Sequence, residues 1–428
     1  MATAFKTVEW AATANIYEVN LRQYTPEGTI TAFQKELPRL RDMGIDILWF
    51  MPLTPISIEK RQGTLGSYYA CSDYTSVNKE FGTLEDFKQL VVSAHELGFK
   101  VIIDWVANHT GYDHVWTKEY PQFYKRNSEG KFYDEFGWSD VIDLDYNNRN
   151  LWEVMVTVMD FWIKECDIDG FRCDMAHLVP LDFWFYARTI LDKRKRLFWL
   201  AESEVAEYHR VFDATYAWEL LHIMEAVYKS TATLKDLRNV LDKYDTIFPS
   251  DALRLLFTSN HDENSHNGSE YERFGDSART FAVLCTTWKN SLPLIYSGQE
   301  MPEKKRLKFF DKDPIEWTGS YLLAGFYKVL LSLRKSCFAL RAGEVQVITR
   351  IINTNAFENI FAFIRKHEES EVLVILNLSN SSRIRFKITE DFICGRFTSA
   401  FSGIETDISA LTTFEMQQWE YLVYYRKS

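Results

Sequence analysis

Ionisable side chains stand at the carboxyl ends of four hydrophobic runs of the sequence. In the first run Arg172 and Asp174 are two residues apart, and the other runs end in further acids and histidines. The four runs are IDGFRCD (168–174), VIIDWVANH (101–109), FWLAE (198–202) and FTSNHD (257–262). An ionised side chain beside a hydrophobic strand costs free energy unless it is paired or hydrated. One such Asp is more often a helix cap or an ion-pair partner, but four runs that end in this way indicate a reactive site.

Glycoside hydrolysis is the chemistry that needs clustered carboxylates without a metal or a phosphate-binding loop. One ionised carboxylate attacks the anomeric carbon, and one carboxylic acid protonates the leaving oxygen. Retaining enzymes hold this pair about 5 to 5.5 Å apart, which neighbouring strands about 4.8 Å apart can provide. Asp174 and Glu202, from consecutive runs, meet this requirement. We expect Arg172 to keep Asp174 ionised, because an adjacent guanidinium lowers the pKa of a carboxylate.

Such a site needs strands whose carboxyl ends meet, and the sequence predicts them. From about residue 15 to 293, short hydrophobic runs alternate with helical patterns, as in repeated βα units around a parallel sheet. The runs are NIYEVN, DILWFMP, KVIIDWV, IDGFRCD, RLFWLAE, RLLFTSN and LPLIYSG. With a weaker strand near VFDATYAW they make eight, the number that closes a (β/α)₈ TIM barrel. An open doubly wound sheet is the competing α/β architecture.

The barrel and its surrounding helices determine where side chains point. Because side chains alternate along a strand, Arg172 and Asp174 should face the barrel interior, while Phe171 and Cys173 face the helices. Cys173 is therefore expected to pack rather than to react. A helix is predicted from about Asn148 to Cys166, with a buried stripe at three- and four-residue steps. Its members are Leu151, Val154, Val158, Phe161 and Trp162.

Two further segments are predicted outside the barrel. About 40 residues follow the third strand, far more than a usual βα loop, and we interpret them as a small inserted domain. After a helix with a stripe from Leu323 to Leu333, β-type runs begin at about Ala339. The predicted domains are a barrel of residues 1–107 and 146–338, an inserted domain of 108–145 and a C-terminal antiparallel β-sandwich of 339–428.

Composition restricts the class of ligand. Lys and Arg number 49 against 60 Asp and Glu, a net charge of −11 without a long basic run, so a nucleic-acid footprint is excluded and a neutral substrate fits better. No stretch of about 18 apolar residues predicts a membrane span. Six scattered cysteines do not indicate disulfides. No leader is visible in MATAFKTVEW, so we expect a cytoplasmic protein, or a periplasmic or secreted one if a leader was removed.

Taken in order, the motifs resemble those of the α-amylase family, glycoside hydrolase family 13, from about Tyr17 to the C-terminus. The four signatures are DWVANH (104–109), GFRCDMAH (170–177), AE within FWLAESE (198–204) and SNHD (259–262). Weaker matches are GIDILWFMP, YYACSDYTSVNKEFGT, IDLDY and LPLIYSGQE. The resemblance implies Asp174 as nucleophile and Glu202 as general acid and then base. It implies Asp262 as a third acid that binds ring hydroxyls as the oxocarbenium-like state forms.

The resemblance also implies residues that surround the sugar in the subsite before the cleaved bond. His109 and His261 would donate hydrogen bonds to this sugar, and Tyr69 would stack under it. Arg172 would brace Asp174, and Asp104 would fix Arg172 or His109 from behind.

Two departures from the family pattern affect acceptor and metal binding. His177 and Leu178 stand where the family commonly has Lys and then His, so the acceptor side differs. No cofactor is required for the chemistry, and a structural Ca²⁺ is the one ion that the resemblance suggests, through Asn108 and Asp143. Two oxygen ligands do not establish calcium, which takes six to eight. The alternative is that these two side chains only hydrogen-bond the loop.

The resemblance thus implies a retaining α-glucan hydrolase that cleaves α-1,4-glucosidic bonds of starch or maltooligosaccharides. An α-glucosidase or a glucan transglycosylase would keep the same catalytic residues and differ in acceptor subsites. A non-catalytic sugar-binding protein on the same barrel is the alternative from another class, and the presence of all three acids disfavours it. The expected partner is an α-glucan oligosaccharide or polysaccharide, with no nucleic acid and no membrane, and oligomeric state is left open.

Overall fold

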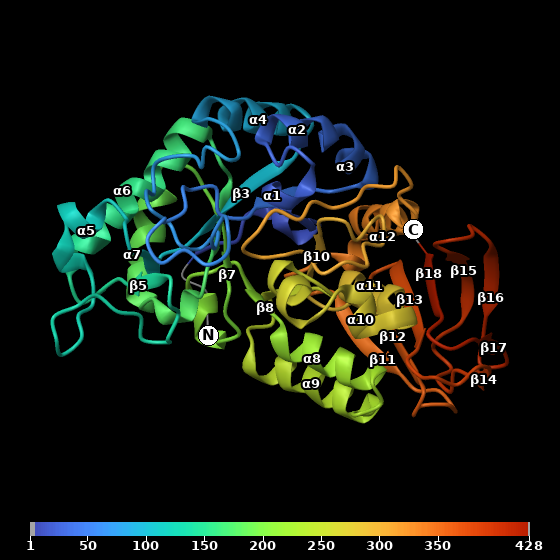
Figure 1. Ribbon diagram of the computed structural model, residues 1–428. Helices are drawn as coiled ribbons and strands as arrows, with labels where there is room; N and C mark the ends of the chain where they lie inside the picture. The colour runs from blue at the N-terminus through green and yellow to red at the C-terminus, as the bar shows by residue number, and fades with distance from the viewer. Residues whose placement is uncertain (1–4, 427–428) are drawn as a thin grey trace.

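A closed barrel of eight parallel strands forms the centre of the molecule, in a computed structural model that describes residues 5–426 (Figure 1). The strands follow one another around the barrel in the order β1-β10-β9-β8-β7-β6-β3-β2. Their bounds are β1 (Ile16–Val19), β2 (Ile47–Phe50), β3 (Lys100–Trp105), β6 (Gly170–Cys173), β7 (Phe198–Ala201), β8 (Ala214–Tyr216), β9 (Leu253–Leu256) and β10 (Ser291–Tyr296). The predicted (β/α)₈ barrel is confirmed, including the weak eighth strand.

The barrel register brings the predicted site residues to one end. Asp104 on β3 pairs with Arg172 on β6, and Arg172 pairs with Leu200 on β7. Phe171 and Cys173 are fully buried in the core between strands and helices, whereas Arg172 contacts acids inside the barrel. The predicted alternation of side chains is therefore confirmed, and Glu202 follows directly after β7.

Helices surround the barrel and bury their apolar faces against it. They are α1 (Leu21–Tyr24), α2 (Ile30–Phe33), α3 (Leu37–Met43), α4 (Leu84–Glu96), α6 (Arg149–Cys166), α7 (Leu181–Leu191), α8 (Trp218–Tyr228), α9 (Leu234–Ile247), α10 (Glu270–Phe274), α11 (Ala278–Thr287) and α12 (Ala324–Ser336). Within residues 5–426, none of them has the length and apolar content of a membrane span.

Helix α6 begins where the sequence predicts, because the Asn148 side chain accepts a hydrogen bond from the backbone N–H of Asn150. Its buried face differs from the predicted stripe. Leu151 and Trp162 are buried as expected, but three members of the stripe are only partly buried: Val154, Val158 and Phe161. The helix turns a neighbouring row inward instead, and this row is Met155, Met159, Ile163 and Cys166.

The segment after β3 forms a small unit that projects from the barrel (Figure 1). It contains a two-stranded antiparallel sheet of β4 (His109–Gly111) and β5 (Val141–Asp143) and the short helix α5 (Trp116–Glu119). The pairing of His109 with Asp143 joins the two ends of the insertion. It therefore lies beside the carboxyl end of β3.

The C-terminal region is antiparallel, as predicted. A six-stranded sheet has the order β11 (Ile348–Ile352), β12 (Ile360–His367), β13 (Ser370–Asn377), β18 (Tyr421–Arg426), β15 (Gly395–Ser399) and β16 (Glu405–Ile408), and a second sheet pairs β14 (Ile384–Lys387) with β17 (Thr413–Met416). One face of the larger sheet packs on the smaller sheet. Its other face shares a hydrophobic core with the barrel.

Candidate active site

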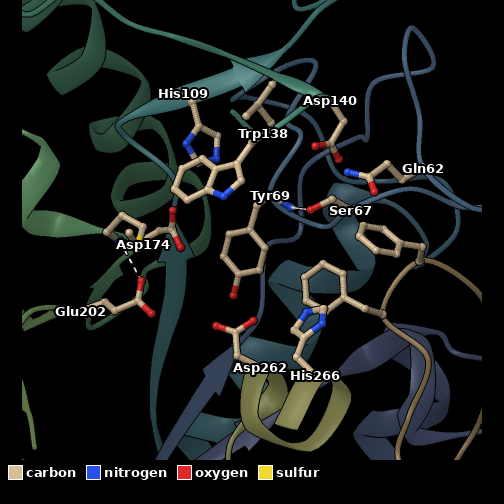
Figure 2. Close-up of a pocket in the computed structure, with 14 residues that line it drawn as sticks. Gln62, Ser67, Tyr69, His109, Trp138, Asp140, Asp174, Glu202, Asp262 and His266 are labelled. Carbon is tan, nitrogen blue, oxygen red and sulfur yellow. Dashed lines mark hydrogen bonds between the residues drawn. The ribbon is translucent and has the colours of Figure 1, made fainter. Parts of the chain in front are cut away.

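Side chains from the barrel ends, the insertion and two long loops line one cavity of about 300 Å³ (Figure 2). This volume is at the lower end of the range for ligand pockets, roughly 300 to 1,000 Å³. The lining residues are Gln62, Ser67, Tyr69, His109, Trp138, Asp140, Val141, Asp174, Met175, Glu202, Asp262, His266, Phe309 and Phe310. The three acids that the sequence singled out therefore meet in one place.

Arg172 lies directly beneath this cavity and holds acids from three adjacent strands. Its Nη1 is 2.9 Å from Asp104 Oδ1 and 3.0 Å from Asp174 Oδ1. Its Nη2 is 2.9 Å from Glu202 Oε1, and its Nε donates to the Tyr216 hydroxyl at 3.1 Å. The guanidinium is fully buried. Asp174 and Glu202 thus lie on the same side of the sheet and contact one common cation.

The second oxygen of each carboxylate has a different environment. Among the described residues, Asp174 Oδ2 accepts no hydrogen bond although it is buried. Glu202 Oε2 accepts a hydrogen bond of 2.8 Å from the backbone N–H of Met175. Met175 has a left-handed φ of 40°, which is uncommon for a residue with a side chain. Asp262 is more open, with 38% of its side chain exposed.

Burial raises the pKa of both central acids. The pKa of Asp174 rises to about 7 because of burial and the nearby charges of Asp104 and Asp262, although Arg172 lowers it. The pKa of Glu202 also rises to about 7 through burial, Asp174 and Asp262, against the effect of Arg172. Arg172 lowers the pKa of Asp174 as predicted, but it does not keep this acid fully ionised at neutral pH, because the desolvation of a buried carboxylate outweighs one cation. The pair can therefore share a proton near neutral pH.

Tyr69 and His261 form one hydrogen-bonded unit beside the acids. Burial raises the pKa of Tyr69 well above its usual value, and its hydroxyl donates to Asp104 Oδ2 at 3.1 Å. Burial lowers the pKa of His261, but Asp262 and Glu18 raise it to about 9. The protonated ring uses both nitrogens, one toward Glu18 and one 2.6 Å from the Tyr69 hydroxyl.

The His261 ring is 1% exposed and does not line the cavity. This geometry does not support the predicted direct hydrogen bond from His261 to the sugar, and the ring instead orients Tyr69. His109 does line the cavity, and burial lowers its pKa to about 4. The neutral ring has its Nδ1 at 3.3 Å from the Asn108 amide nitrogen, which leaves Nε2 to carry the proton as a donor.

Asp104 and His177 lie outside the cavity lining. Asp104 contacts Arg172 and Tyr69 from below and accepts a hydrogen bond of 3.2 Å from Trp49 Nε1. Of the two partners expected for Asp104, Arg172 is the one it contacts. His177 is exposed, and its Nδ1 is 3.4 Å from the Glu202 carbonyl oxygen. It lies next to the backbone of the acid rather than in the cavity.

Several lining residues carried no recognisable signal in the sequence. Trp138 and Asp140 come from the insertion, and the Trp138 ring is 5.3 Å from the His109 ring. Phe309 and Phe310 come from the long loop after β10. Such positions follow no strand or helix period, so only the path of the folded loop brings them to the site.

The residues at the suggested calcium position do not fit that ion. The Asn108 amide nitrogen is 3.5 Å from Asp143 Oδ1, and the Lys125 ammonium is 3.2 Å from Asp143 Oδ2. Calcium needs six to eight oxygen ligands, and a cation that is part of the chain already faces the buried carboxylate. Over residues 5–426 no group of three His, Cys, Asp or Glu side chains is placed to hold a metal. The alternative, in which Asn108 and Asp143 tie the loop together, agrees better with these contacts.

A (β/α)₈ barrel carries its active site at the carboxyl ends of its strands, and two acids that border one cavity there are what glycoside hydrolysis requires. The family model of the α-amylase catalytic domain matches residues 9–133 and 123–316. The chain therefore belongs to the α-amylase family, and it is a glycoside hydrolase.

Relatives in sequence and structure span most of the chain. Alpha-amylase 2 of Dictyoglomus thermophilum is 25% identical over 420 residues, covering 90% of this chain and 69% of the relative. A cyclomaltodextrinase of Thermoanaerobacter pseudethanolicus is 23% identical, covering 84% of this chain and 65% of the relative. The crystal structure of a noncanonic maltogenic α-amylase from Thermotoga neapolitana is 29% identical, with a TM-score of 0.89 over 97% of this chain and 98% of that one.

Proposed function

We propose that the protein is a retaining α-glucan hydrolase that cleaves α-1,4-glucosidic bonds by double displacement. Asp174 attacks the anomeric carbon as the bond to the leaving oxygen breaks, and Glu202 gives its proton to that oxygen. Glu202 then takes a proton from water, whose oxygen attacks the same carbon and releases Asp174. Each acid returns to its starting protonation state.

The observation that carries this proposal is the contact of Asp174 and Glu202 with one buried guanidinium. Because both carboxylates border the same cavity and share the same cation, a bond placed between them can be attacked and protonated together. Asp174 Oδ2 accepts no hydrogen bond from the described residues and is the oxygen available for attack. The raised pKa of Glu202, about 7, allows it to hold the proton that the leaving oxygen needs.

Other charges support the transition state. Positive charge develops on the sugar ring as the glycosidic bond breaks, and the partly exposed carboxylate of Asp262 borders the same cavity. Asp262 would bind ring hydroxyls and stabilise this charge, and Arg172 would stabilise Asp174 once the carboxylate is released. Tyr69, held by Asp104 and His261, would stack under the ring.

Two measurements test the proposal. Proton NMR of fresh maltoheptaose digests should show the α-anomer of the new reducing end first, because two displacements retain configuration. A β-anomer would contradict a covalent intermediate on Asp174. Chromatography of products from maltoheptaose, amylose and pullulan then separates hydrolysis from transfer, because transfer would give products longer than the substrate. Binding without any cleavage would favour the non-catalytic alternative.

A further inference from the structure

The two ends of the catalytic cavity differ in what they offer a sugar chain. Figure 2 shows Asp174 and Glu202 on one side of the cavity and Gln62 and Asp140 on the opposite side. A general acid must lie on the leaving-group side of the cleaved bond. The exposed His177, next to the Glu202 backbone, is on that same side. The side of Gln62 and Asp140 therefore receives the sugars that come before the cleaved bond.

The side of the cavity with Gln62 and Asp140 is closed by two loops that are hydrogen-bonded to each other. The backbone N–H of Leu65 donates to the Phe310 carbonyl at 3.0 Å. Asp311 accepts hydrogen bonds from Thr64 through its backbone N–H at 2.8 Å and its hydroxyl at 2.7 Å. Gly63, with φ of 60°, packs so tightly that an added Cβ would be 2.6 Å from Phe310 Cβ. These contacts join the two loops directly.

A buried arginine braces this wall from behind. Arg22 is fully buried and donates to the Gly66 carbonyl at 2.9 Å and to the Phe309 carbonyl at 3.2 Å. Its Nε and Nη2 pair with both oxygens of Glu80 at 2.9 and 3.2 Å. Because one rigid guanidinium holds both loops, the wall is a fixed part of the cavity rather than a loop lying across it.

Three polar side chains face the closed end without a hydrogen-bond partner among the described residues. Asp140 is 5% exposed, yet no other described residue gives it a hydrogen bond or an ion pair. Gln62 and His266 likewise have no hydrogen-bond partner among residues 5–426, and the His266 ring lies 5.0 Å from the Phe309 ring. A buried carboxylate is costly unless something satisfies it. Sugar hydroxyls are suited to this, since each donates one hydrogen bond and also accepts.

We infer that Asp140 and Gln62 bind the hydroxyls of the non-reducing terminal sugar against the Phe309–Phe310 wall, so that the enzyme acts from the chain end. This inference rests on the proposed hydrolysis of α-glucans. The whole cavity has a volume of about 300 Å³, at the lower end of the range for ligand pockets, so its closed end has room for a short chain end rather than for a long chain. The enzyme therefore releases glucose or maltose from non-reducing ends and does not cut inside long chains.

A blocked substrate tests this directly. The wild-type protein is given maltoheptaose and a maltoheptaoside whose non-reducing O4 and O6 carry an ethylidene group, and the products are separated by chromatography. We expect a single short product from the free chain and at least about 100-fold slower cleavage of the blocked chain, since the block cannot enter the closed end. Comparable rates on both substrates would overturn the inference and leave the hydrolysis intact. Cleavage of neither would instead refute the proposed function.

Substitutions of Asp140 and Phe310 test whether these two residues are responsible for cleavage from the chain end. Asp140→Ala should lower kcat/KM for maltoheptaose about tenfold or more, the loss expected for a hydrogen bond to a charged group. Glu129→Gln, on an exposed turn of the same insertion, serves as the matched control and should change little. Phe310→Ala should open the wall and raise the rate on the blocked substrate at least about tenfold relative to wild type. An Asp140→Ala variant with wild-type kinetics would overturn the assigned binding role.

Discussion

At the scale of single residues, a substitution of Asp174 should abolish catalysis while leaving substrate binding largely intact. Asp174→Asn removes the attacking oxygen but keeps the shape of the side chain, so turnover of maltoheptaose should fall by about 10⁴ or more. Binding of the oligosaccharide, measured by calorimetry, should stay within a few-fold of wild type. Activity above a thousandth of wild type would contradict the role of Asp174 as nucleophile.

The same substitution has a pH-dependent effect on stability. Folding raises the pKa of Asp174 to about 7 from about 4 in an unfolded chain. A carboxyl group whose pKa is higher in the folded than in the unfolded state contributes its full stabilisation below its pKa in the unfolded chain. This contribution is lost as the pH rises through its pKa in the folded protein. At pH 8 wild type carries an ionised buried carboxylate that Asp174→Asn lacks. The variant should therefore melt about 2 °C or more above wild type at pH 8. The difference should be smaller at pH 5. A variant that melts below wild type at both pH values would contradict the raised pKa of Asp174.

Glu202 is tested through the leaving group. Glu202→Gln cannot donate a proton, so the variant should lose most activity on maltooligosaccharides and recover part of it on an aryl glucoside with a good leaving group. The wild-type rate should fall at alkaline pH as Glu202, with its pKa raised to about 7, loses its proton. The variant should lack this alkaline limb when assayed on the aryl glucoside. Rates that show neither recovery nor a changed pH profile would mean that another residue is the acid.

At the scale of elements, the sequence predicts the barrel well because strands buried on both faces leave continuous hydrophobic runs. Asp174 and Glu202 could be located for the same reason, since each directly follows such a run. The buried face of α6 was only partly predicted, because two neighbouring rows of this helix are hydrophobic and only packing decides between them. Asp140 and Phe309 could not be predicted, since both lie on long loops without a strand or helix period, and the Phe309 loop is held by the long-range contact with Arg22.

The insertion gives a prediction about metal dependence. The Lys125 ammonium contacts the fully buried Asp143 carboxylate at the position that the family resemblance suggests for calcium. Chelation should therefore leave the melting temperature unchanged, since no ligand that binds the folded state is removed. Lys125→Met should destabilise the protein by about 1 to 2 kcal/mol, less than for a fully buried pair because Lys125 is partly exposed.

Lys131→Met is the matched control for this test. Lys131 lies in the same insertion, pairs with the exposed Glu129 and is 73% exposed. Its removal should change the melting temperature little, since exposed ion pairs contribute little to stability. A wild-type melting temperature that falls on chelation and returns with added Ca²⁺ would show that the insertion binds calcium after all.

At the scale of the whole molecule, the barrel and the C-terminal sheets share one hydrophobic core. Phe361 and Phe363 on β12 pack around Trp288, between α11 and β10, at ring distances of 5.6 and 4.9 Å. The buried Arg365 donates from the same strand to the Trp288 carbonyl at 2.9 Å and the Thr287 carbonyl at 3.3 Å, at the end of α11. The C-terminal domain thus holds the end of α11, which directly precedes β10 and the loop that carries the Phe309–Phe310 wall.

This shared core predicts that barrel and C-terminal domain unfold together. Arg365→Met leaves the carbonyl groups at the end of α11 buried without their donor, which should cost about 1 to 3 kcal/mol. Calorimetry should show one transition in wild type and one at lower temperature in the variant, because loss of either domain exposes the core of the other. Arg396→Met, at a position on β15 with 68% of the side chain exposed, should melt like wild type. Two separated transitions in Arg365→Met would show instead that the barrel keeps its fold, and the wall of its active site, without help from the C-terminal sheets.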